Sequence, residues 1–247
     1  MDNRSALLKT IARLEARLAD LHARLPAHSV PPAMVAELDE LDEWWHAGVR
    51  ILGPAWAGNR FCGGTAEPGP LTTEGFALLE RMAEVGYILD LSHMDEKAAL
   101  QALDAYSGQI VATHANPLAK LPGSQSNRHL SDRVIRGLIE RDGMIGIVPF
   151  NNFLKVGWSR RDDVSLITVY QQIDHICQLA GDANHVGIGT DFDGGFGLQS
   201  TPNGMGTIAD LKKIVPILRQ GGYPEDSVTA IFGKNWLDCI GKALPKK

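Results

Sequence analysis

The sequence reads YILDLSH over residues 87–93 and IVATH over residues 110–114. In both segments a short apolar run, typical of a buried strand, ends directly in a histidine, His93 in the first and His114 in the second. Their separation suits neighbouring strands of a βαβ unit, and the carboxyl ends of parallel strands lie at one rim of a sheet. Imidazole nitrogen is a preferred zinc ligand. We therefore predict that His93 and His114 face one cavity and bind a zinc ion; two separate, hydrogen-bonded loop histidines are the alternative.

Strand-like runs recur on both sides of these two segments, with helical patterns between them. This alternation is typical of βα units that build a parallel sheet. Thr72 and Ser131 are expected to cap helices, and Gly86, Gly143 and Gly181 to end them. Five strands are too few to close an eight-stranded barrel, so the predicted fold is α/β, a partial TIM-type (βα) barrel with parallel strands. The expected strands are residues 49–53, 87–91, 110–113, 144–150 and 185–190, and the expected helices are residues 72–85, 96–106, 131–141, 165–181, 207–220 and 224–242.

The first 33 residues have a different pattern. Apolar side chains alternate at intervals of three and four residues, which is the spacing of a heptad seam on a helix. Pro31 and Pro32 then end the helix, because proline has no amide donor. We therefore divide the chain into an amphipathic helix with its linker, residues 1–33, and a barrel domain of about five strands, residues 34–247. The helix either lies on the protein's own core or pairs two chains, and an open sheet with uncovered edges favours a homo-oligomer. The seam residues are Leu7, Ile11, Leu14, Leu18, Leu21 and Leu25.

Composition narrows the class of protein. The chain has 247 residues, a net charge of −5 and scattered basic residues, which argues against a nucleic-acid partner. No apolar run approaches the roughly 18 residues that span a bilayer, and no secretory segment follows Met1. Cys62, Cys177 and Cys239 lack C-x-x-C spacing. We therefore expect reduced thiols, a cytoplasmic location and no membrane span.

Two further residue types could act at the same rim. Residues 189–195 read GTDFDGG, so the last expected strand is followed by two carboxylates, Asp191 and Asp193, that can serve as a general base or as metal ligands. A turn in which the aspartate binds its own loop amides is the alternative. Arg128 precedes a helix and can present its planar guanidinium to a substrate carboxylate, or it can be an exposed arginine. The amides at residues 150–152 are weaker candidates for substrate contact. No G-x-S-x-G motif indicates a covalent nucleophile.

Taken in order, several motifs resemble the membrane (renal) dipeptidase family over residues 38–244. These motifs are GVR at 48–50, GPLTTEG at 69–75, ILDLSH at 88–93, ATHAN at 112–116, NRHL at 127–130, GTDFDG at 189–194 and NWL at 235–237. The resemblance implies a zinc-dependent metallopeptidase with an amidohydrolase-like barrel that hydrolyses dipeptides. It also implies that His93 and His114 ligate one zinc, that Arg128 holds the substrate carboxylate, and that Asp191 is the acid and base of catalysis.

The chain also departs from the family pattern. Family members bind two zinc ions, and the resemblance implies further ligands from an amino-terminal His-x-Asp and a bridging glutamate. The His-x-Asp of this chain is His93-Met94-Asp95, whose histidine already matches another ligand. We therefore expect a chain equivalent to the carboxyl-terminal two-thirds of a member, with one zinc or none. Trp56 also stands near a position where many relatives carry a histidine.

Replacement ligands are not evident either. The acidic residues and the histidine that follow the linker have a helical spacing that favours a solvated face. These residues are Asp39, Glu40, Asp42, Glu43 and His46.

Three functions stay open: a weak or inactive dipeptidase, a non-catalytic binding or assembly protein, and a mononuclear zinc amidohydrolase.

Overall fold

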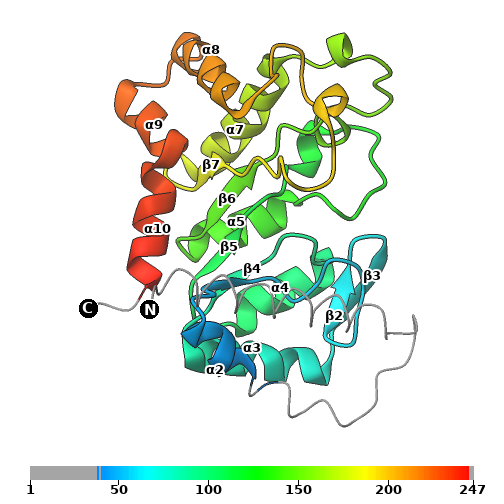
Figure 1. Cartoon of the computed structure of the whole chain (residues 1–247), viewed down its shortest axis with the longest axis vertical. Coiled ribbons are helices and arrows are strands. Elements are labelled where there is room, and N and C mark those ends of the chain that lie inside the picture. Colours follow the sequence, from blue (N-terminus) through cyan, green and yellow to red (C-terminus); the bar gives the residue numbers. More distant parts are fainter. Residues whose placement is uncertain (1–37, 39, 245–247) are drawn as a thin grey trace, which may run out of the picture.

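The computed structural model describes residue 38 and residues 40–244 of the chain. Its centre is a five-stranded parallel sheet in the order β1-β4-β5-β6-β7 (Figure 1). All five expected strand segments form strands of this sheet, each shorter than the sequence pattern indicated. The α/β class and the parallel arrangement are therefore confirmed, and the sheet stays open rather than closing into a barrel. The strands are β1 (Ile51–Leu52), β4 (Ile88–Asp90), β5 (Ile110–Ala112), β6 (Met144–Ile147) and β7 (Val186–Ile188).

Four helices cover one face of the sheet, and their ends follow the expected capping residues. The Thr72 and Ser131 side chains accept hydrogen bonds from the amides of Gly75 and Val134, and Gly86 and Gly181 end helices in the left-handed conformation. At residues 141–143 it is Asp142 that takes the positive φ, while Gly143 donates its amide to the Leu138 carbonyl. The cap is thus shifted by one residue from the expected glycine. The four helices are α3 (Thr73–Val85), α4 (Glu96–Ala105), α5 (Asp132–Glu140) and α7 (Leu166–Ala180).

The last part of the chain is more broken than the sequence pattern indicated. The expected helix at 207–220 is a 3₁₀ segment, η5 (Ile208–Ile214), followed by α8 (Val215–Gln220). The expected helix at 224–242 consists of α9 (Glu225–Thr229), a π-helical turn η6 (Ala230–Lys234) and α10 (Asn235–Ala243), with a kink at Gly233. Shorter helical segments are α2 (Glu40–His46), η2 (Leu118–Lys120), α6 (Asn151–Leu154), η3 (Arg161–Asp163) and η4 (Leu198–Ser200).

An antiparallel hairpin was not expected from the sequence. Strands β2 (Cys62–Gly64) and β3 (Glu67–Leu71) pair with each other, with Cys62 opposite Leu71. The segment contains three glycines and two prolines and has no alternation of apolar and polar residues, so its pattern is typical of a loop. The hairpin lies beside α4, at the end of the sheet where β4 terminates (Figure 1).

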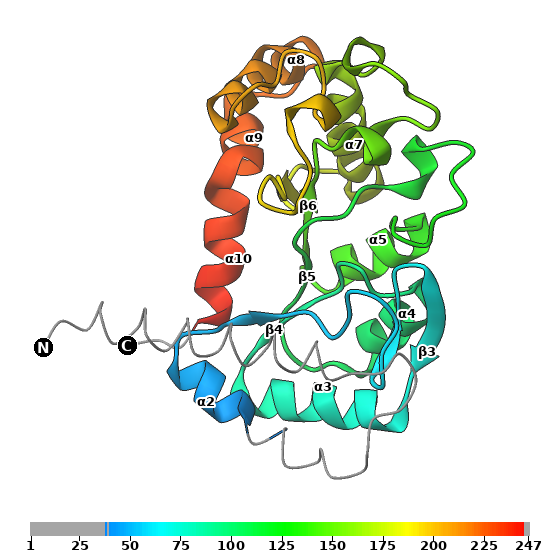
Figure 2. The same ribbon diagram turned by 45° about the vertical axis from the view of Figure 1, so that its right-hand side comes forward.

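Helix α10 covers the face of the sheet opposite to the four helices, as both views show (Figures 1 and 2). Ile88, Val111 and Met144 on three neighbouring strands form a buried cluster with Cys239 of α10. Trp236 lies directly over β7, where a side chain on Gly187 would overlap the indole, and its Nε1 donates to the Ile188 carbonyl at 3.1 Å. In a closed barrel this face would surround the barrel axis. Here the carboxyl-terminal helix occupies part of that space.

The outer sides of β1 and β7 have no strand neighbour among the described residues. The expected amino-terminal amphipathic helix and the boundary at residue 33 lie outside the described residues. No helix in the described part of the chain combines the length and the apolar composition needed to cross a bilayer.

Candidate metal and substrate site

The two strand-end histidines meet at the carboxyl end of the sheet. β4 and β5 are neighbours in register, with Asp90 opposite Val111, so the residues that follow each strand emerge side by side. His93 has φ +70°, a turn that brings its ring back over the sheet edge. The Nε2 atoms of His93 and His114 are 3.0 Å apart. The structure therefore brings together the pair for which the sequence predicts metal binding.

The other ring nitrogen of each histidine contacts a threonine hydroxyl. Thr113 Oγ1 donates to the Asp90 carboxylate at 2.5 Å, which leaves it to accept the hydrogen of His114 Nδ1 at 2.6 Å. Thr65 Oγ1 lies 3.0 Å from Nδ1 of His93 and 3.5 Å from its carbonyl oxygen. For His114 this arrangement places the hydrogen on Nδ1 and leaves the Nε2 lone pair for a ligand, and the contact of His93 with Thr65 suits the same tautomer. Such outer contacts fix the tautomer of metal-binding histidines.

Burial and a neighbouring cation favour the neutral form of both imidazoles. Burial, the Arg128 charge and His114 together lower the pKa of His93 to about 3. Burial and Arg128 also lower the pKa of His114, partly offset by three nearby aspartates. Neutral imidazole is the form that binds zinc, and two Nε2 atoms at this separation fit adjacent positions on one ion. The pair supplies two of the four usual positions, and within the described residues no group of three or more histidine, cysteine or acidic residues is gathered for a metal.

Arg128 is buried beside the histidine pair, with 5% of its surface exposed. Its Nη2 donates to the His114 carbonyl at 2.6 Å, and its guanidinium lies 5.1 Å from the centre of the Phe153 ring. Its Nε and Nη1 have no hydrogen-bond partner among the described residues. Burial lowers the pKa of Arg128 to about 10, which leaves it charged at neutral pH. A buried cation with two unused donors is suited to a carboxylate ligand.

Asp191 follows β7 at the same edge of the sheet. It has φ +51°, and its carboxylate lies so close to Gly194 that a side chain there would overlap it. The negative charge of Asp191 raises the pKa values of both His114 and Arg128, against the effect of burial. The carboxylate therefore acts on both groups across the site. Asp191 and Arg128 were each predicted for this rim, and their catalytic and substrate-binding roles stay predictions.

Three residues at the site were missed by the sequence analysis or given no role there. Thr65 belongs to the turn of the unexpected hairpin. Asn127 donates to the Gly64 carbonyl and to Asp95, and accepts from the Ala66 amide, so it fastens that hairpin to the site. Trp56 is 72% exposed and stacks on the His93 ring, with 5.4 Å between ring centres. These contacts join segments that are far apart in the sequence, so no local sequence pattern predicts them.

Other expected and alternative ligands lie elsewhere. Asp42 on α2 forms an ion pair with Arg81 of α3, and His46 contacts the Asp42 carbonyl, as expected for a surface helix. Asn151 begins α6 rather than ending a strand, and Asn152 accepts a hydrogen bond from Trp158. The amides at residues 150–152 therefore do not form the strand end that the sequence pattern indicated.

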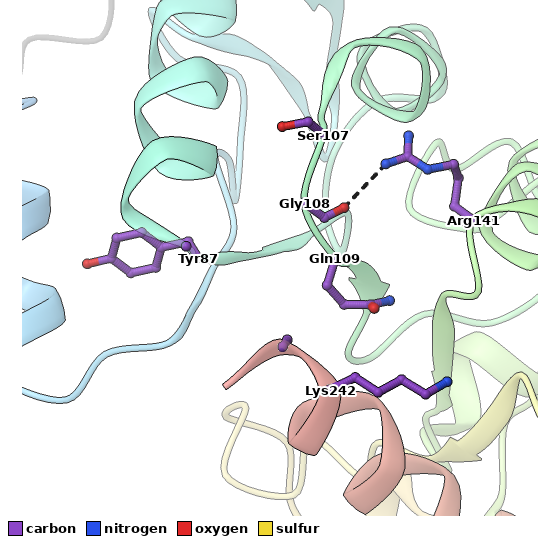
Figure 3. A pocket seen from close by; sticks show the side chains of 8 residues that line it. Tyr87, Ser107, Gly108, Gln109, Arg141 and Lys242 are labelled. Atoms are coloured by element: carbon purple, nitrogen blue, oxygen red, sulfur yellow. Dashed lines mark hydrogen bonds between the residues drawn. The ribbon is translucent and has the colours of Figure 1, made fainter. Parts of the chain in front are cut away.

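A cavity of about 470 Å³ lies at the opposite, amino-terminal ends of β4 and β5 (Figure 3). Its two cations already have partners. Arg141 donates to the carbonyls of Leu103, Tyr106 and Gly108, and Lys242 pairs with Asp142. This cavity therefore offers no free charge to a ligand, and the histidine pair at the carboxyl ends is the better candidate site.

Two proteins of related sequence match about two thirds or more of this chain. The chain is 32% identical over 210 residues to an uncharacterized protein in the pqqA 5' region of Klebsiella pneumoniae, covering 81% of this chain and 74% of that protein. It is 28% identical over 169 residues to the dipeptidase tcpJ of Claviceps purpurea, but spans only 36% of that protein's length.

Solved structures agree with this. A metallopeptidase from Rhodobacter sphaeroides, liganded with a phosphinate mimic of the dipeptide L-Ala-D-Ala, superposes with a TM-score of 0.74 and 30% identity over 85% of this chain, which spans 60% of that structure. An amidohydrolase from Pseudomonas aeruginosa has the same TM-score at 22% identity and supports the fold alone. The family model described as membrane dipeptidase, peptidase family M19, matches residues 9–244. Because this match extends over nearly the whole chain, the protein belongs to the membrane dipeptidase family.

Proposed function

We propose that the chain is a zinc-dependent hydrolase of dipeptides, with His93 and His114 as ligands of one zinc ion. The observation that carries the proposal is the 3.0 Å separation of two Nε2 atoms whose Nδ1 partners are threonine hydroxyls. Two Nε2 atoms at this separation can occupy adjacent positions on one zinc ion, each about 2.0–2.1 Å from it.

Each of the other site residues has a distinct part in the proposed reaction. Arg128 binds the terminal carboxylate of the dipeptide through Nε and Nη1, the donors that have no described partner. Asp191 accepts a proton from the attacking water and delivers it to the leaving amine. A bound zinc supplies Lewis-acid polarisation of the amide carbonyl and a water of lowered pKa. Trp56 shields the His93 side of the site from solvent.

Two relatives support this assignment. The Rhodobacter structure holds a mimic of a dipeptide, and tcpJ is named a dipeptidase. The chain spans only part of each of these proteins, so the substrate and activity of the present chain are proposals. Its cytoplasmic location also stays a prediction.

Two alternatives follow because the described part of the chain brings only two imidazoles together. Two imidazoles leave two positions on zinc for water or substrate, which suits a mononuclear amidohydrolase. A chain that binds a carboxylate at Arg128 without turnover would be a binding protein. Zinc content separates the binding protein, with none, from a zinc enzyme with one ion per chain, and two ions per chain would indicate a binuclear site with further ligands. Hydrolysis of dipeptides then separates the proposed dipeptidase from an amidohydrolase of other substrates.

The test is zinc analysis of the purified chain, followed by hydrolysis of a dipeptide panel. Replacing His93 and His114 together by alanine is expected to abolish zinc binding and turnover. The matched control is His46→Ala, because His46 is an exposed histidine on α2. Zinc content and turnover that survive the double substitution contradict the proposed site.

A further inference from the structure

A second cavity, separate from the one in Figure 3, lies in the loop region that follows Asp191. Its volume is about 180 Å³, and its side-chain lining is largely apolar, from Phe192, Phe196, Leu198 and Met205. An engineered cavity of about 150 Å³ with a similar lining binds benzene. The cavity is therefore large enough for a branched aliphatic or phenyl side chain.

The walls of this cavity are held by hydrogen bonds within the structure. Arg161 donates to the backbone carbonyls of Thr201 and Met205, and the Thr201 hydroxyl bonds to the Leu198 and Met205 carbonyls. On the other side, the Gly206 and Thr207 amides donate to the Asp210 carboxylate at 2.8 and 2.9 Å. A preformed pocket loses little conformational entropy on binding a ligand.

Two residues that line the cavity relate it to the groups proposed to contact the carboxyl-terminal half of a dipeptide, one by its place in the chain and the other through a series of ring contacts. Phe192 follows Asp191 directly in the chain. From Phe196, aromatic rings continue to Phe150 at 4.3 Å and then to Phe153 at 5.1 Å, and the Arg128 guanidinium lies 5.1 Å over Phe153. In the proposed reaction Asp191 faces the leaving amine and Arg128 the terminal carboxylate. Both of these groups belong to the carboxyl-terminal residue of the substrate.

We propose that this cavity receives the side chain of the carboxyl-terminal residue, and that it selects apolar side chains of the size of leucine or phenylalanine. The inference rests on the proposed function, and it adds which residue of the substrate is selected and by what chemistry. An apolar pocket discriminates between substrates by the hydrophobic contact that each added carbon makes. One methylene changes kcat/KM by about 10- to 200-fold.

The first experiment compares kcat/KM for dipeptides that differ at one position only. Glycyl-alanine, glycyl-leucine and glycyl-phenylalanine, each in L and D form, vary the carboxyl-terminal residue. Leucyl-glycine and phenylalanyl-glycine vary the amino-terminal one. We expect glycyl-leucine or glycyl-phenylalanine to exceed glycyl-alanine by about tenfold or more in at least one stereochemical series. Equal values along both glycyl series overturn the inference.

The second experiment fills the cavity. Gly206→Leu adds a side chain to the lining, and the structure has room for it, because a Cβ at Gly206 meets only Asp210 Oδ2 at 3.5 Å. The expected result is that the preference for leucine over alanine disappears while turnover of glycyl-alanine is kept. Gly241→Leu, on the exposed side of α10 with open space around its Cβ, is the matched control and is expected to keep the preference. An unchanged preference in Gly206→Leu contradicts the proposal.

A third measurement separates this inference from the proposed function. Leucine, phenylalanine and alanine are titrated separately into ¹⁵N-labelled protein while the amide signals of Gly197, Gly206 and Thr207 are followed. Tighter binding of leucine and phenylalanine at these amides, without hydrolysis of any dipeptide, supports the pocket and contradicts the catalytic proposal. Hydrolysis with no such shifts and no side-chain preference does the reverse. If neither binding nor hydrolysis is observed, both the pocket and the catalytic proposal are contradicted.

Discussion

Asp90 organises the candidate site although it does not contact the proposed zinc position. Its carboxylate accepts hydrogen bonds from the amides of Ser92 and Thr113 and from the Thr113 hydroxyl. The Ser92 hydroxyl in turn accepts the His114 amide. One buried carboxylate thus joins the ends of β4 and β5 and sets the orientation of the His114 ring. Hydrogen bonds that orient a metal-binding histidine in this way are worth about 10- to 100-fold in metal affinity.

Thr113→Val tests this arrangement, because valine keeps the shape of threonine but cannot accept the Nδ1 hydrogen of His114. We expect zinc affinity, measured by competition with a chromogenic chelator, to fall about 10- to 100-fold. Thr229→Val, at an exposed position on α9, is the control and is expected to keep the parent affinity. Parent affinity in Thr113→Val would show that the tautomer is set in another way.

Asp191→Asn removes the proposed proton carrier while keeping the size of the side chain. Asparagine tolerates the positive φ at this position, so the thermal midpoint should not change. Turnover is expected to fall by at least about 100-fold, the lower end of the range for general acid–base catalysis. The control is Asp182→Asn, an exposed aspartate in the loop before β7, which is expected to retain turnover. Turnover at the parent level in Asp191→Asn removes this residue from the mechanism.

The residues at the site differ in how far sequence could reveal them. His93, His114 and Asp191 each follow directly after an apolar strand, and the rule that parallel strands end at one rim is enough to group them. Thr65 and Asn127 depend on a glycine- and proline-rich hairpin whose pattern is typical of a loop. Their contacts form only once the hairpin packs beside α4. Their part in the site is therefore a product of tertiary packing.

Among the elements, α10 shows how sequence can predict a helix without its location. The pattern at 224–242 predicted a helix, and in the structure α10 has an apolar stripe, with Trp236, Cys239 and Ile240 packed against the sheet. A stripe does not say which face it covers. The five strands are apolar on both faces, as is usual for parallel sheets, so either face could accept the helix. Only the structure shows α10 on the face opposite to α3, α4, α5 and α7.

Trp236→Ala tests whether α10 stabilises the fold by covering that face. The substitution removes the indole over Gly187 and its hydrogen bond to Ile188. We expect the free energy of unfolding in urea to fall by about 2–3 kcal/mol, less than the cost of truncating a fully buried tryptophan because Trp236 is half-buried. Leu237→Ala is the control, since Leu237 is 74% exposed on the same helix, and its effect should be below about 0.5 kcal/mol. Equal effects would mean that α10 is not an important cover.

In the whole molecule, both the faces and the edges of the open sheet must be covered. Its faces are covered within the chain, by four helices on one side and by α10 on the other. Its edges are covered less completely: β1 pairs only with β4, and β7 only with β6, among the described residues. An uncovered edge of a parallel sheet exposes unpaired amides and carbonyls and favours association. The expected role of the helix in residues 1–33, lying on the protein's own core or pairing two chains, stays a prediction.

The homo-oligomer predicted from the sequence can be tested at this scale. Size-exclusion chromatography with light scattering would compare the full chain with a version that starts at Pro31. We expect the full chain to be a dimer or larger, because a leucine seam at heptad spacing is suited to pairing two helices. The shorter version should shift toward monomer and lose thermal stability, since its sheet edges lose their partner. A monomer in both forms with one thermal midpoint would show that residues 31–247 complete their own core.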